Sequence, residues 1–263
     1  MGTLAIIISL ALLMFFAYRG ISVLILAPIM AAVAILLSGD MAYMMPQYTE
    51  TFMSALGGYI LKFFPIFLLG ALFGQLMVDS GAASSISNSI MHKLGHQRAI
   101  LTVVLACGVL TYGGVSLFVV AFAIYPIAKS MFQAANIPKR LIPGAIALGS
   151  FTFTMTALPG SPSIQNAIPI PFFGTNVFAA PGIGIISGLI MFGLGSMWLQ
   201  SRANKARSNG EGYGIDTQEG EKLEDGVTSQ GHMPVFLAFL PLLLVIGVNA
   251  LFTYIVFPSM DFS

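Results

Sequence analysis

Long apolar runs dominate this sequence, and most of its charged residues fall between them rather than within them. Hydrophobic residues make up 57% of the 263 positions and charged residues only 8%, whereas a soluble domain carries roughly a quarter charged residues. A bilayer core about 30 Å thick is crossed by about 20 residues of apolar helix. The sequence therefore predicts an all-α polytopic membrane protein, folded as a helix bundle.

The charges that flank each run predict how the chain threads the membrane. The first run, 3–18, lacks the preceding basic residue and the following small-x-small site of a cleaved signal peptide. Because Arg19 follows it, we expect a retained span with the amino terminus outside. The next spans are expected at 21–37 and 56–78, followed by an amphipathic helix, 82–96, on the cytoplasmic surface.

The segment 99–129 contains two apolar runs that are short for spans, separated by a polar break. Basic residues both precede and follow the segment, so both of its ends should face the cytoplasm. We predict a re-entrant helical hairpin with a glycine turn at mid-membrane, a position where irregular backbone must be buried in protein or line a wet cavity. The candidate binding residues in this break are Thr111, Tyr112, Gly113, Gly114 and Ser116.

A second break interrupts the predicted span 141–170, where prolines, hydroxyls and amides cannot continue a lipid-facing helix. Its candidate binding residues are Thr156, Pro159, Gly160, Ser161, Ser163, Gln165 and Asn166. A further span, 182–199, returns to the cytoplasm, and a polar cytoplasmic loop, 201–232, separates it from the last apolar segment, 233–263.

This order of spans is typical of an inverted repeat, because the last helix runs in the opposite sense to the first. We interpret 1–200 as the first transmembrane repeat and 233–263 as the first span of a second, truncated repeat. On this interpretation the chain is one half of a longer transporter.

The two breaks are the predicted site for a small organic anion. Free N–H groups and the positive dipole end of a helix bind anions, and hydroxyls and unwound carbonyls also suit Na⁺. The coupling ion is expected to be H⁺ or Na⁺, and no other cofactor is expected. The structural alternative is that these residues merely cap helix ends and satisfy one another.

The sequence shows no pattern for nucleotide binding, enzyme catalysis, metal binding or nucleic-acid binding. The sequence has no phosphate-binding P-loop and no nucleophile, base and orienting residue in a recognisable arrangement, so we predict no enzyme. Cys107 is the single cysteine, and His92 and His96 have no third ligand nearby, so no metal site is predicted. We interpret the two histidines as part of a solvated basic face. The net charge of +1 offers no nucleic-acid surface.

Three stretches of the chain resemble the gluconate permease (GntP) family of the ion-transporter superfamily. They are 76–82 with its Asp79, 112–138 from Tyr112-Gly113-Gly114 through Tyr125-Pro126, and 158–169 with Leu158-Pro159-Gly160. The resemblance covers most of the chain but corresponds to the amino-terminal half of such a permease. It implies secondary active uptake of sugar acids or related carboxylates, usually with protons, across a bacterial cytoplasmic membrane.

The chain departs from that family pattern at two positions. Gluconate permeases have a Tyr-Glu pair where this chain has Tyr112-Gly113, and a His-Pro pair where it has Ser161-Pro162. The loss of two ionisable groups leaves a short hydroxy or keto acid or citrate open beside gluconate. A passive channel and a non-transporting membrane scaffold are the rival function classes, and a homodimer is also left open.

Overall fold

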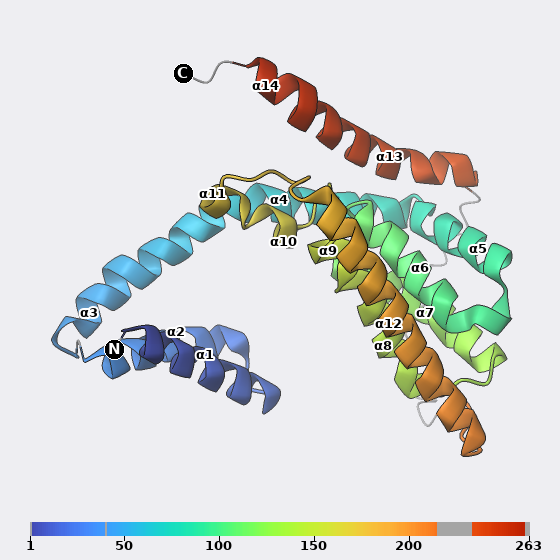
Figure 1. Cartoon of the computed structure of the whole chain (residues 1–263), viewed down its shortest axis with the longest axis horizontal. Coiled ribbons are helices and arrows are strands. Elements are labelled where there is room, and N and C mark those ends of the chain that lie inside the picture. Colours follow the sequence, from blue (N-terminus) through green and yellow to red (C-terminus); the bar gives the residue numbers. More distant parts are fainter. Residues whose placement is uncertain (1, 40, 215–232, 261–263) are drawn as a thin grey trace. The chain divides into compact units, whose positions relative to one another are not determined.

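The computed structural model describes residues 2–39, 41–214 and 233–260, apart from the side chains of Met41 and His96. Every regular element within these residues is a helix, which confirms the all-α prediction (Figure 1). The chain forms two compact units, Met1–Pro65 and Ile66–Ser263. Each unit is described by itself.

The first unit contains a helical pair, α1 (Gly2–Tyr18) and α2 (Val23–Ser38). Gly20 in the connecting turn and Gly39 after α2 both adopt positive φ, near +88° and +89°. These are conformations in which a residue without a Cβ costs least. The elements that continue the chain are Met41–Tyr43, α3 (Met44–Pro46), the π-helical turn Gln47–Phe52 and α4 (Met53–Asp79), which ends in the second unit.

The second unit contains the remaining helices. In chain order they are α5 (Ala82–Leu94), α6 (Ala99–Tyr112), α7 (Leu117–Ala134), α8 (Ile142–Ser150), α9 (Phe153–Thr156), α10 (Ile164–Ala167), α11 (Ile170–Phe173), α12 (Pro181–Ser208), α13 (Val235–Leu251) and α14 (Phe257–Ser259). A π-helical turn, Phe252–Val256, joins α13 to α14, and 3-10 turns precede α6 and α8.

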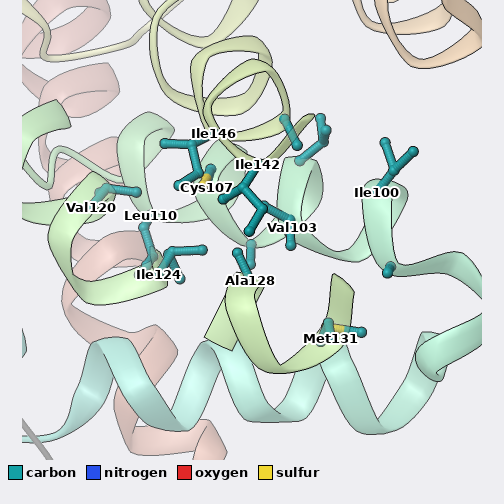
Figure 2. Packing of buried hydrophobic residues seen from close by; sticks show 14 of the residues in the cluster. Ile100, Val103, Cys107, Leu110, Val120, Ile124, Ala128, Met131, Ile142 and Ile146 are labelled. Carbon is teal, nitrogen blue, oxygen red and sulfur yellow. The ribbon is translucent and has the colours of Figure 1, made fainter. Parts of the chain in front are cut away.

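The core of the second unit lies around α6. Its side chains are buried on nearly all sides, and α7, α8 and α12 pack around it (Figure 1). Figure 2 shows Val103, Cys107 and Leu110 of α6 facing Ile124 of α7 and Ile142 of α8. Lipid tails are as apolar as these side chains, so close van der Waals packing rather than water exclusion must stabilise such a bundle. A helix that is apolar all round fits this central place.

The described residues include four helices that are long and apolar enough to cross a membrane. These are Met44–Asp79, Leu117–Ala134, Pro181–Ser208 and Val235–Ser259, and α1, α2 and α6 are shorter apolar helices. The chain is thus a multi-pass membrane protein. Because α7 has 18 residues and could span by itself, the re-entrant course of 99–129 stays a prediction.

The first part of the predicted polar loop, 201–232, is ordered against the bundle. Helix α12 continues to Ser208, and the segment that follows it docks on the connection between α7 and α8. The Tyr213 amide donates to Asn136 Oδ1 at 2.9 Å, the Lys139 amide donates to Tyr213 O at 3.3 Å, and Arg140 pairs with Glu211 at 2.6 Å. We call these contacts the latch. Residues 215–232 of the loop lie outside the described part of the chain.

Candidate functional site

The first break is a helix ending formed by the backbone. Val115 N–H donates to Leu110 O at 3.1 Å and Gly114 N–H to Thr111 O at 3.0 Å, while Gly114 has φ near +100°. This is the Schellman pattern of a helix carboxyl end, in which a left-handed glycine closes the last carbonyls. Gly114 therefore has a local structural role, as the capping alternative expected.

The amino end of α7 is left open by the same turn. Ser116 is the residue before α7, and within the described part of the chain its side chain makes no capping hydrogen bond. The first N–H groups of a helix have no partner inside the helix and carry its positive dipole end. Helix α4 approaches closely here, since a Cβ added to Gly74 would lie 3.4 Å from the Ser116 nitrogen.

Side chains hold the second break together. Asn166 Nδ2 donates to Ser161 O at 3.0 Å and to Val177 O at 2.9 Å, and Ser163 Oγ donates to Met155 O at 2.9 Å. Ser161 is fully buried, and its hydroxyl donates to Ser163 Oγ at 3.1 Å. These bonds supply partners for polar groups that the break removes from regular helix.

Glycine is needed at the centre of this second break. Gly160 has φ near +79°, and an added Cβ would collide with the ring of Phe178. The Gly160 amide donates to Val177 O at 2.7 Å. This bond joins the segment that precedes α10 to the segment that follows α11.

The two breaks meet in the folded chain. Tyr112 Oη at the end of α6 donates to Pro159 O at 2.8 Å. At Gly114 an added Cβ would lie 3.0 Å from Pro162 Cγ and 3.7 Å from Val245 of α13. The sequence predicted two polar clusters, and the structure brings residues from both into one place, with α13 against them.

Of the other predicted residues, some are packed in the core and others are exposed. Thr111 is 2% exposed, and its hydroxyl has no hydrogen-bond partner among the described residues. Gly113 faces Leu242 of α13. Thr156 and Gln165 are exposed, and the Thr156 hydroxyl donates at 3.1 Å to the carbonyl of Thr152, the residue before α9. Those two side chains are therefore not gathered with the rest.

No Asp, Glu, His, Lys or Arg lies within the breaks themselves, 111–116 and 156–166. The interaction they offer an anion must come from N–H groups, hydroxyls and helix dipoles. His92 is exposed on α5, and the side chain of His96 lies outside the described part of the chain. Within the described residues, no three His, Cys, Asp or Glu side chains gather as a metal site would require.

Sequence reasoning missed the contribution of α13. Two hollows lie beside this helix, one of about 540 Å³ that Pro162 of the second break also lines and one of about 340 Å³ beside Asn176 and Val177. Asn249 borders both. The available signal was a single amide in an otherwise apolar run, since polar groups inside membrane helices seldom face lipid.

A comparison with known protein families finds a match over almost the whole chain. The model of the GntP family permease matches residues 1–260. The chain belongs to this family. The resemblance seen in the three sequence stretches is thereby confirmed at the level of the family.

Two relatives of this GntP family chain are themselves described only as transporters. The chain is 50% identical to the uncharacterized transporter YxjC of Bacillus subtilis over 258 residues, which is 96% of this chain and 54% of that protein. It is 34% identical to an uncharacterized transporter of Haemophilus influenzae over 127 residues, which is 48% of this chain and 30% of that protein. The chain thus spans about half the length, or less, of these relatives. No solved structure matches it.

Proposed function

We propose that this chain forms part of a secondary active transporter, a symporter that imports a small organic anion with H⁺ or Na⁺. The substrate class is a sugar acid, a hydroxy or keto acid, or citrate, and the membrane is the bacterial cytoplasmic membrane. The observation that carries the proposal is the bond from Tyr112 Oη to Pro159 O, which joins two polar breaks inside an apolar bundle. Membership of a permease family supports the same class of function.

The polarity of the first break favours an anion. The Schellman bonds occupy carbonyls at the negative end of α6, whereas the positive end of α7 has no side-chain cap among the described residues. A carboxylate placed near Ser116 would therefore meet free N–H donors and a favourable dipole, with little opposing charge.

The second break supplies the complementary groups. The hydroxyls of Ser161 and Ser163 lie 3.1 Å apart, and the carbonyl of Pro159 in the same break accepts the Tyr112 hydroxyl. Such oxygen atoms are suitable ligands for Na⁺, and they can also donate or accept hydrogen bonds with a carboxylate or a hydroxyl of the solute. Symport would follow if anion and cation bind together at the meeting point of the breaks.

Uptake into proteoliposomes tests this function. The complete protein is reconstituted, and labelled gluconate, citrate and hydroxybutyrate are offered with a pH gradient or a Na⁺ gradient imposed separately. Saturable uptake that one gradient drives supports the symporter and names its ion. Uptake that does not saturate and ignores both gradients would instead indicate a channel, and no uptake of any anion would favour the scaffold.

A further inference from the structure

The smaller hollow beside α13 has the composition of a binding site. Its volume of about 340 Å³ lies at the lower end of the range for small-molecule pockets. Four of its lining residues carry hydrogen-bonding side chains, namely Thr175, Asn176, Asn249 and Thr253, and the others are Ile170, Val177, Phe257 and Pro258. We propose that this hollow is a second solute site, which selects hydroxylated carboxylates on their way to the two breaks.

The polar groups converge from two separate elements. Asn249 near the end of α13 and Thr253 in the π-helical turn that follows it both line the hollow. Thr175 and Asn176 lie in the segment that follows α11. The helical register changes at the π-helical turn Phe252–Val256, and such turns occur often at functional sites.

The side chain of Asn176 is oriented by its own loop. Its Oδ1 accepts a hydrogen bond from the Phe178 amide at 2.9 Å, which leaves the two Nδ2 hydrogens as donors. The ring of Phe178 in turn lies 5.3 Å from the ring of Tyr254, the neighbour of Thr253. This ring contact joins the segment to the π-helical turn and holds the two walls of the hollow together.

The chemistry of the lining indicates the solute class. Amides and hydroxyls both donate and accept, so together they can bind a carboxylate and the hydroxyl groups beside it. The lining residues carry no charge, and an unsubstituted carboxylate would use only the donors. The site therefore distinguishes hydroxylated from plain carboxylates by the number of hydrogen bonds that each can make.

The hollow lies beside the meeting point of the breaks. Asn249 and Phe257 also line the larger hollow, whose other residues include Pro162 and Val245. A Cβ added to Gly114 would lie 3.0 Å from Pro162 Cγ and 3.7 Å from Val245. A solute at Asn249 is thus separated from the first break by residues that line the neighbouring hollow, and the inference rests on the proposed transport of carboxylates.

Thiol accessibility in the complete protein tests the site. Asn249→Cys and Thr253→Cys are made one at a time, with any cysteine outside this chain replaced, because the native Cys107 is fully buried. Leu251→Cys is the matched control, since Leu251 lies about 200° around the helix from Asn249 and is 46% exposed. We expect a charged, water-soluble thiosulfonate to label positions 249 and 253 and to leave position 251 unlabelled.

Protection and kinetics give the decisive readouts. Saturating gluconate, citrate or hydroxybutyrate, whichever the parent protein transports, should slow labelling of Asn249→Cys at least fivefold, whereas butyrate should not. Asn249→Ala should raise the KM for the hydroxylated anion about tenfold with Vmax retained. Asn249→Gln, which keeps an amide, should raise the KM by less.

Three results would overturn the second site. They are an unreactive Asn249→Cys, labelling that the transported anion does not slow, and a KM that Asn249→Ala leaves unchanged. If any one of these results occurs while the parent protein still takes up the anion, the second site fails and the transport function stands. If the parent takes up no anion at all, both proposals fall.

Discussion

Tyr112 is the residue whose side chain bonds the two breaks to each other, and its neighbours explain why a phenol is needed. The phenol spans from the end of α6 to the carbonyl of Pro159 at 2.8 Å. Pro159 lies between α9 and α10, where no regular helix supplies a donor for its carbonyl. Phenylalanine would keep the ring and lose the hydroxyl donor.

Tyr112→Phe should therefore lower the rate of uptake without removing the protein from the membrane. A hydrogen bond of this kind contributes about 0.5–1.5 kcal/mol, so we expect a loss of roughly 3- to 10-fold in initial rate. Tyr125→Phe is the control, because Tyr125 is an exposed residue of α7. Equal rates for the two variants would show that the bond between the breaks has no part in transport.

Gly114 allows a second prediction at the scale of a residue. An alanine there would meet two costs, the left-handed backbone of about 1–2 kcal/mol and the contact of its Cβ with Pro162. At Gly39 the φ is similar, near +89°, but an added Cβ meets nothing within 4 Å.

Gly114→Ala should accordingly reduce thermal stability more than Gly39→Ala and should also impair uptake. Gly39→Ala should show the backbone cost alone, with uptake close to that of the parent. The measurement is thermal unfolding of the purified proteins in detergent beside uptake in liposomes. The opposite order of stability would contradict the described packing of the two breaks.

At the scale of an element, the Asn166 amide makes two of the bonds that hold the second break. Asn166 donates to Ser161 O and Val177 O, but Val177 O also accepts from the Gly160 amide. Removing the Asn166 side chain would thus leave Ser161 O short of its partner while Val177 O keeps one.

We expect Asn166→Ala to destabilise the protein by about 1–3 kcal/mol, as one buried carbonyl loses its donor. Asn88→Ala, an exposed change on α5, should shift the unfolding midpoint little. Thermal unfolding in detergent measures both. A midpoint for Asn166→Ala that matches that of Asn88→Ala would indicate that the amide does not stabilise the break.

The elements show how far sequence alone can reach. Pairs such as Gly113-Gly114 and Pro159-Gly160 identify interruptions of a membrane helix because they act locally, through φ, missing donors and absent side chains. Apolar runs of the right length likewise predicted helices. These local rules yielded the all-helical fold and the two breaks.

Contacts between distant parts of the chain could not be predicted in the same way. Tyr112 and Pro159 are 47 positions apart, and Ser85 and Met233 are 148 apart. No local property of either residue encodes its partner, so the meeting of the breaks emerged only with the fold. The same reason explains why Asn249 and the latch at Tyr213 were missed.

At the scale of the whole second unit, the segment between α12 and α13 is anchored before and after residues 215–232. The latch fixes Tyr213 against Asn136, and Ser85 Oγ of α5 donates to Met233 O at 2.8 Å where α13 begins. Helix α13 also packs along α5. The covalent link is therefore not what holds α13 in place.

We predict that cutting the chain within 215–232 leaves its two parts associated. A protease site is inserted there in the complete protein, the preparation is cleaved, and a tag on one fragment is used for purification in detergent. Recovery of both fragments is the expected result. Separation of the fragments would show that the contacts of α13, among them the bond from Ser85 Oγ to Met233 O, are too weak to replace the peptide bond.

If α6 and α12 cross the membrane upright, their lengths set the depth of the two breaks. The 14 residues of α6 extend about 21 Å from Arg98 to Tyr112. On α12, Gly188 packs against Leu158 of the second break, and it too lies about 21 Å from Arg202. With both arginines at the edge of a hydrocarbon layer about 30 Å thick, the breaks would lie about two thirds of the way across. A solute that enters from the side opposite the two arginines would then cross only about 10 Å of the apolar layer to reach the breaks. A solute that leaves the breaks toward the arginines would cross about twice that distance.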